Sequence, residues 1–150
     1  MKELLFTGAG TALVTPFDKS GNIAWDEIEK LVEYQIESGI DALIACGTTG
    51  EAATMTSEEH LKTIDFIIQK SKGRVPVIAG TGSNDTRHAI ELSKAAEAIG
   101  ADAILSVTPY YNKATQKGLY LHFKMIADSI KIPAILYNIP SRTGFNMNPD

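Results

Sequence analysis

Short apolar runs alternate with longer amphipathic stretches along the chain. Five continuous apolar runs predict strands buried on both faces, at residues 9–14, 41–46, 75–80, 102–107 and 133–138. Between them, apolar side chains recur at spacings of three and four and predict helices at residues 26–37, 57–72, 86–99 and 117–130. Because a helix connects each strand to the next, the pattern implies a parallel sheet covered by helices.

The same local pattern occurs twice in the chain. Gly39-Ile40-Asp41 and Gly100-Ala101-Asp102 each place a helix-stopping glycine and an aspartate directly before an apolar strand. The two copies lie two strand–helix units apart, which supports this division of the chain into repeating units.

Two architectures fit five such units. A doubly wound domain of the flavodoxin type has about this length, whereas a (β/α)8 barrel needs roughly 250 residues, so length alone favours the doubly wound domain. Both architectures place ligand-binding loops at the carboxyl ends of the strands. The unusual polar residues of this chain all fall there: Thr48, Thr49, Thr81, Tyr110, Tyr111, Tyr137, Asn138 and Arg142.

The composition is that of one soluble domain, with 44% hydrophobic and 21% charged residues. A formal charge of -4 and a pI near 5.4 argue against nucleic-acid and anionic-membrane partners. Cys46 is the only cysteine, and the first residues are too polar for a secretory or membrane-spanning segment. We therefore expect a cytoplasmic protein.

The loop after the second predicted strand reads Gly47-Thr48-Thr49-Gly50-Glu51. Its glycines leave backbone amides uncovered, which suits a small anion, although an ordinary turn would use the same residues. Threonine and tyrosine hydroxyls can pass protons without net charge, and Arg142 offers a planar fork for a carboxylate. Together these residues predict a site for small acidic carbonyl compounds. For any one of them, the alternative is packing at the rim of the core.

Other chemistries find little support in the sequence. The glycine pairs at residues 8–10 and 80–82 lack the third glycine of a dinucleotide fingerprint, and no GxxxxGK[ST] motif occurs. His60, His88 and His122 stand on separate predicted helices. We therefore expect no metal site, and histidines that are at the surface or partly buried.

Five segments resemble the dihydrodipicolinate synthase family in sequence and in order: residues 10–17, 47–51, 80–82, 108–112 and 136–144. The resemblance covers essentially all 150 residues, and Arg142 within Ser-Arg-Thr-Gly favours a synthase over the sialic-acid lyases of the superfamily. It implies that residues 1–150 are the N-terminal portion of a single (β/α)8 TIM-barrel catalytic domain, holding about its first five strands and four helices.

The resemblance also implies a reaction. Such a class I aldolase-type lyase condenses pyruvate with L-aspartate 4-semialdehyde through a lysine imine, in lysine and diaminopimelate biosynthesis, with no cofactor. Tyr137, Thr48 and Tyr111 correspond to the proton relay of the family. In that family Tyr111 reaches into the site of a neighbouring subunit, within a homotetramer that is a dimer of dimers.

The same resemblance assigns the substrate carboxylates. Thr49, with the amides of its loop including Gly50, would hold the carboxylate of pyruvate. Arg142 would bind the carboxylate of the semialdehyde, and its loop would help to position Tyr137.

The imine lysine of the family belongs to the strand after Tyr137, beyond Asp150. The eleven lysines of this chain fall at the terminus, in predicted helices or in polar turns, whereas an activated amine needs a desolvated pocket. We therefore expect a longer parent chain of the synthase type. Two alternatives stay open, namely a related pyruvate aldolase acting on sialic or sugar acids, and a non-catalytic half barrel without the imine lysine.

Lysine-sensitive members of the family bind that inhibitor at the tight-dimer interface. The matching positions here are Ala52, Ala53, Ser57, His60, Asn84, His88 and Tyr110. Sensitive enzymes usually carry a carboxylate at the position of His88, where it binds the ammonium group of the inhibitor. An imidazole does this less well because it is either neutral or positively charged. The resemblance therefore predicts weak inhibition by lysine.

Overall fold

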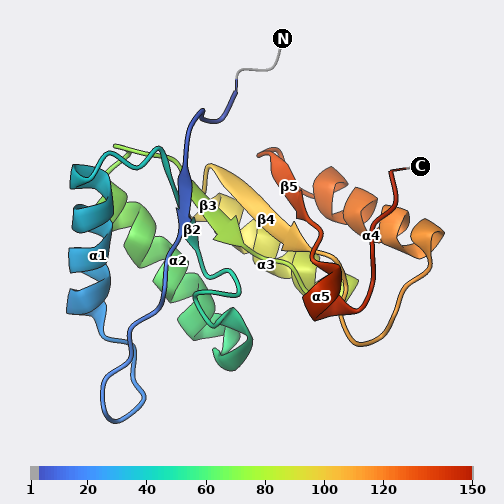
Figure 1. Cartoon of the computed structure of the whole chain (residues 1–150), viewed down its shortest axis with the longest axis horizontal. Coiled ribbons are helices and arrows are strands. Elements are labelled where there is room, and N and C mark those ends of the chain that lie inside the picture. The colour runs from blue at the N-terminus through green and yellow to red at the C-terminus, as the bar shows by residue number, and fades with distance from the viewer. Residues whose placement is uncertain (1–3, 150) are drawn as a thin grey trace.

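The computed structural model describes residues 4–149, which form a five-stranded parallel sheet and four long helices (Figure 1). The strands are β1 (Gly10–Ala12), β2 (Ala42–Ala45), β3 (Val77–Gly80), β4 (Ala103–Val107) and β5 (Ala134–Tyr137). The long helices are α1 (Trp25–Glu37), α2 (Ser57–Ser71), α3 (Thr86–Ala98) and α4 (Gln116–Asp128). Every predicted strand and helix is confirmed, with ends that differ by at most two residues.

Two short helical turns were not predicted. The 3-10 turn η1 (Ala52–Thr54) lies between β2 and α2, and α5 (Pro140–Thr143) follows β5. Among residues 4–149, each helix is too short or too polar to cross a membrane.

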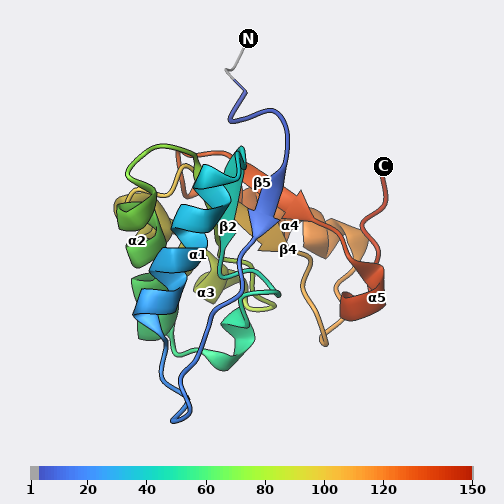
Figure 2. The same ribbon diagram turned by 60° about the vertical axis from the view of Figure 1, so that its left-hand side comes forward.

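The strands lie in the sheet in chain order, from β1 to β5. Because each crossover is right-handed and each new strand is added on the same side, every helix is expected on the same face of the sheet. Figures 1 and 2 show α1 to α4 on that face. A doubly wound domain reverses direction and covers both faces. The preference that length alone gives is therefore wrong, because length does not report the direction in which strands are added. The sheet has the strand order of the first five strands of a barrel.

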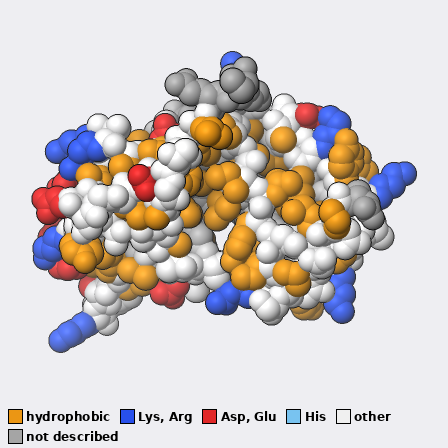
Figure 3. Space-filling model, turned by 45° about the horizontal axis from the view of Figure 1, so that its top comes forward, with side chains coloured by type: hydrophobic (Ala, Val, Ile, Leu, Met, Phe, Trp, Pro, Cys, Tyr) orange, Lys and Arg blue, Asp and Glu red, His pale blue; other side chains and the backbone are white. Residues whose placement is uncertain are grey.

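Side chains of the strands alternate between two apolar layers. On the helix side, Leu43, Val77 and Ile104 are buried beneath apolar residues of the helices. The opposite layer contains Ala42, Ile78 and Ala103, with Leu5, Phe6, Ile44, Leu105 and Ile135 packed against them. Figure 3 shows hydrophobic side chains gathered across the middle of the molecule. Both faces are apolar, which explains why the strands read as continuous apolar runs rather than alternating ones.

The aspartates of the repeated sequence pattern form hydrogen bonds to the amino ends of neighbouring strands. The Asp41 carboxylate accepts a hydrogen bond from the Ala9 amide at 2.8 Å, just before β1. The Asp102 carboxylate accepts one from the Val77 amide of β3, also at 2.8 Å. The two copies thus make the same contact, from an even strand to the preceding odd strand. They lie at the end of the sheet opposite the predicted ligand loops, where residues serve stability.

Candidate active site

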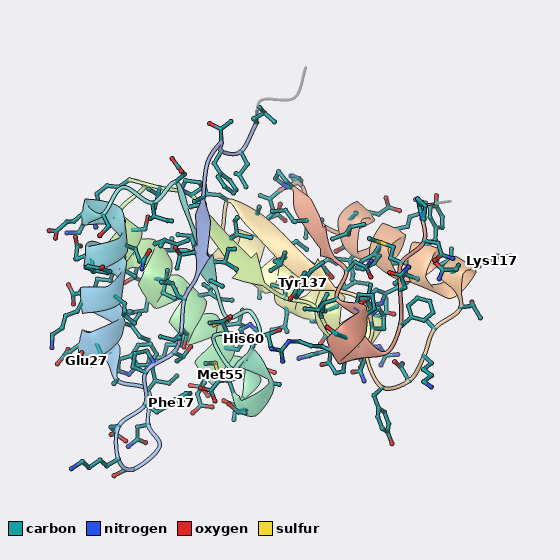
Figure 4. All side chains as sticks on the ribbon, in the orientation of Figure 1. Phe17, Glu27, Met55, His60, Lys117 and Tyr137 are labelled. Atoms are coloured by element: carbon teal, nitrogen blue, oxygen red, sulfur yellow. The ribbon has the colours of Figure 1, made fainter. Side chains whose placement is uncertain are left out.

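A cavity of about 310 Å³ opens at the carboxyl ends of the strands. Its walls come from the loops after β2 and β3, the start of α2, one face of α3, and the ends of β4 and β5. Figure 4 shows Tyr137 at the end of β5, with His60 and Met55 on the side of α2 and η1. Of the predicted site residues, Thr48 and Tyr137 line this cavity together. They come from strands far apart in the sequence.

Four predicted site residues do not line the cavity. Thr49 is exposed on the loop after β2, and Gly50 is buried within it. Arg142 is exposed on α5, and the side chain of Tyr111 is 92% exposed. Within this chain the structure therefore brings two of the six predicted residues into one cavity and leaves the other four outside its lining.

The loop after β2 is a tight turn with two unoccupied amides. The Gly50 amide donates to the Gly47 carbonyl and the Glu51 amide to the Thr48 carbonyl, each at 3.1 Å. From the segment after β1, the Thr15 hydroxyl donates to the Gly50 carbonyl at 2.8 Å and fixes the loop. The amides of Thr48 and Thr49 make no hydrogen bond to other described residues. The loop thus presents two amides and two exposed hydroxyls to a ligand.

Close backbone contact joins this loop to β3. Cys46 has a φ of 54°, the left-handed conformation that side chains other than glycine rarely adopt. A Cβ atom at Gly80 would lie 2.3 Å from the Cys46 carbonyl oxygen, so only glycine fits there. Strained backbone of this kind often occurs at functional sites, where the surrounding structure holds it in place.

Cys46 itself is not suited to nucleophilic chemistry. Its thiol is buried, and burial raises its pKa to about 12. The sulfur lies 3.7 Å from the His60 carbonyl oxygen, where a thiol can donate. A thiol that stays protonated is a poor nucleophile, so Cys46 contributes packing to the floor of the cavity.

His60 lies in the cavity wall in its neutral form. Its Nε2 is 2.7 Å from the Gly80 carbonyl oxygen, which can only accept, so Nε2 carries the proton. Burial lowers the pKa of His60, the bond to Gly80 raises it, and the nearby His88 lowers it further. Surface or partly buried histidines were expected, and this is wrong for His60 and His122, which are buried. The reason is helical spacing, which places His60 on the same face as the buried Ile64.

Hydroxyl contacts connect the end of β4 to the segment after β5. The Thr108 amide donates to the Tyr137 carbonyl at 3.0 Å, and the Thr108 hydroxyl donates to the Thr143 hydroxyl at 3.4 Å. The buried Thr143 hydroxyl also bonds to the Phe145 backbone. The short helix α5 begins with Pro140 and ends at Gly144, whose φ is 68°. Proline at the start and glycine just after the end are the signals from which this helix could have been predicted. Arg142 is therefore carried by an ordered turn beside Tyr137.

Sequence reasoning missed several residues of the cavity. Glu51 ends the predicted loop and was given no role there, yet it also lines the cavity. Ser83 lines the cavity from the glycine loop after β3. No lysine among the described residues lines it; Lys2 lies outside the described residues.

The chain is similar to known proteins over nearly its whole length. Residues 5–150 match the model of the dihydrodipicolinate synthetase family. The chain is 63% identical to the 4-hydroxy-tetrahydrodipicolinate synthase of Acetivibrio thermocellus, over 99% of this chain and 51% of that protein. The corresponding synthase of Lachnoclostridium phytofermentans is 58% identical, over 97% of this chain and 49% of that protein.

Comparison with solved structures agrees with the sequence comparison. The crystal structure of the chloride-inhibited dihydrodipicolinate synthase from Acinetobacter baumannii, complexed with pyruvate, superposes with a TM-score of 0.92 at 55% identity. The match covers 93% of this chain and 48% of that one. The chain spans about half the length of the curated relatives it matches. On the agreement of sequence, strand order and structure, the chain belongs to the dihydrodipicolinate synthetase family.

Proposed function

We propose that residues 1–150 are the N-terminal portion of a TIM-barrel lyase that condenses pyruvate with L-aspartate 4-semialdehyde through a lysine imine. This reaction would serve lysine and diaminopimelate biosynthesis. The observation that carries the proposal is that Thr48 and Tyr137 line one cavity in a chain of this family. The pyruvate complex of the Acinetobacter baumannii relative supports pyruvate as the first substrate.

The reaction needs several proton transfers, which hydroxyl groups can perform. A lysine amine adds to the ketone of pyruvate and water leaves, giving the imine; loss of a methyl proton gives the enamine. The enamine carbon then adds to the aldehyde, whose oxygen takes up a proton. We assign this relay to Thr48 and Tyr137, with Tyr111 supplied by a neighbouring subunit. The high exposure of Tyr111 supports a role outside its own chain.

We assign the binding of the substrate carboxylates to the loop after β2 and to α5. The Thr49 hydroxyl and the unoccupied amides of Thr48 and Thr49 offer donors for the carboxylate of pyruvate. Gly50 gives the loop its shape, since a Cβ atom there would lie 3.1 Å from the Leu13 carbonyl oxygen. Arg142 would bind the carboxylate of the semialdehyde with its planar fork. No cofactor is needed for these steps.

The assembly that we propose is a homotetramer, a dimer of dimers in which Tyr111 crosses the tight interface. We also propose the cytoplasm as its location. The single cysteine and its burial suit a reducing compartment.

Trapping with borohydride tests the imine. A full-length protein that contains this segment is incubated with pyruvate and borohydride, and its intact mass is compared with that of residues 1–150 treated in the same way. We expect one reduced pyruvate on the full-length chain and none on residues 1–150. Labelling of the short chain would require a lysine that the site model lacks, and an unlabelled full-length chain would refute the imine.

A non-catalytic half barrel is the second candidate function. It is favoured by the absence of any lysine from the cavity lining among residues 4–149. Turnover of the untreated full-length protein with pyruvate and semialdehyde separates the remaining alternative, a related aldolase. Turnover with a sugar acid in place of the semialdehyde would indicate that other specificity.

A further inference from the structure

Tyr111 stands at the centre of an unusual three-residue turn. The Asn112 amide donates to the Tyr110 carbonyl at 2.9 Å, and the φ of Tyr111 is 71°. A hydrogen bond across three residues with a positive central φ defines the rarer, strained form of the γ-turn. A bulky residue in this conformation needs support from its surroundings. Within its own chain the phenol receives little support, because 92% of Tyr111 is exposed there.

The support comes from two asparagines on different loops. The side-chain amide of Asn84, in the loop after β3, donates to the Tyr110 carbonyl at 3.2 Å. The side-chain amide of Asn112 donates in the opposite direction, to the Asn84 carbonyl at 3.2 Å. The turn is therefore held on both sides of Tyr111 by reciprocal bonds to a single residue.

Asn84, to which the turn is bonded, is itself held in place by its neighbours. Asn84 lies between Ser83, whose buried hydroxyl accepts from the Asp85 amide at 3.1 Å, and Asp85, which caps α3. The Asp85 carboxylate accepts from the Arg87 amide at 2.9 Å. The start of a long helix thus anchors Asn84, and Asn84 anchors the turn.

We propose that Asn112 and Asn84 are positioning residues, an amide clamp that holds Tyr111 in its strained turn and so determines where its phenol stands. The clamp is a property of the fold, while its effect on turnover rests on the proposed role of Tyr111 in the proton relay. Loss of the clamp lets the turn relax and leaves the phenol in many positions, which lowers kcat while substrate binding is preserved.

The first test uses Asn112→Asp in the full-length protein. This change removes the side-chain N–H donor and keeps the size of the side chain. Asn148→Asp is the matched control, because its side-chain oxygen only accepts, from Asn146, and an aspartate can still do so. With 3-fluorotyrosine at position 111, the fluorine NMR signal should shift or broaden in Asn112→Asp and stay unchanged in Asn148→Asp. An unchanged signal in Asn112→Asp overturns the clamp.

The second test is a kinetic double-mutant cycle with Tyr111→Phe. We expect Asn112→Asp to lower kcat roughly 3- to 10-fold, the equivalent of one hydrogen bond, with KM for both substrates unchanged. In the Tyr111→Phe background the same change should have no further effect. An equal loss in both backgrounds overturns the positioning role. A shifted fluorine signal together with full activity of Tyr111→Phe supports the clamp and refutes the proposed relay instead.

Discussion

The contact between Gly80 and Cys46 is the tightest constraint on a single residue near the cavity. In Gly80→Ala the new Cβ atom would meet the carbonyl oxygen of Cys46 at 2.3 Å and its carbonyl carbon at 2.7 Å. Backbone atoms at the ends of paired strands cannot move without breaking the sheet. We expect Gly80→Ala to lower the free energy of unfolding by about 2–3 kcal/mol, measured by urea denaturation.

Gly10→Ala is the control for this prediction. A Cβ atom at Gly10 would meet its nearest neighbour, the Phe6 ring, at 3.5 Å, which is ordinary contact. Its free energy of unfolding should change by less than about 0.5 kcal/mol. Equal stability of the two variants would show that β2 and β3 tolerate displacement at this point.

The inhibitor L-lysine offers a second test at the residue scale. His88 and His60 both line the cavity, and the proximity of His88 lowers the pKa of His60. We expect the full-length protein to be weakly inhibited by lysine. His88→Glu should lower the half-inhibitory concentration at least about 10-fold, because a carboxylate pairs with the ammonium group. His88→Gln, which adds no charge, should leave inhibition weak. Micromolar inhibition of the unmodified protein would contradict the prediction.

Single residues differ in how far the sequence reveals them. Thr48 and Tyr137 could be predicted because hydroxyls directly after apolar runs mark the carboxyl ends of strands. The left-handed backbone of Cys46 could not, since nothing in the sequence distinguishes it from an ordinary strand residue. The burial of His60 was also missed, because polar side chains on an apolar helix face are usually assigned to the surface.

At the scale of elements, the repeated aspartate adds one hydrogen bond between neighbouring strands. Asp102→Ala removes the acceptor for the Val77 amide at the start of β3. We expect a loss of about 1–2 kcal/mol in the free energy of unfolding and faster hydrogen exchange at the Val77 amide. Asp102→Asn keeps one carbonyl oxygen as acceptor and should lose less. Unchanged exchange at Val77 in Asp102→Ala would show that the bond contributes nothing to pairing.

The elements themselves were predicted almost completely, and the reason is physical. Buried parallel strands and amphipathic helices leave strong periodic signals, so their ends were found within two residues. The short turns η1 and α5 contain too few residues to show any period. Capping adds detail that spacing cannot give: Thr56, just before α2, forms a reciprocal pair of bonds with Glu59.

At the scale of the whole molecule, two neutral histidines are buried in different parts of the helix layer. Burial lowers the pKa of His60 on α2 and of His122 on α4. The Nδ1 atom of His122 is 2.9 Å from the Thr86 hydroxyl, which links α4 to α3. Both imidazoles resist protonation in the folded state, whereas in the unfolded chain they titrate near the ordinary value of 6.5.

The folded state should therefore lose stability in mild acid. As the pH falls below 6.5, the unfolded chain takes up protons first, so the equilibrium shifts toward it. We expect a constant urea midpoint above about pH 7 and a falling midpoint toward about pH 5. Carboxylates with lowered pKa, such as Glu33 and Glu59, add their own loss only nearer the ordinary value of 4.5. His122→Gln should make the decline between pH 7 and pH 5 shallower, and an unchanged slope would show that His122 takes up its proton equally in both states.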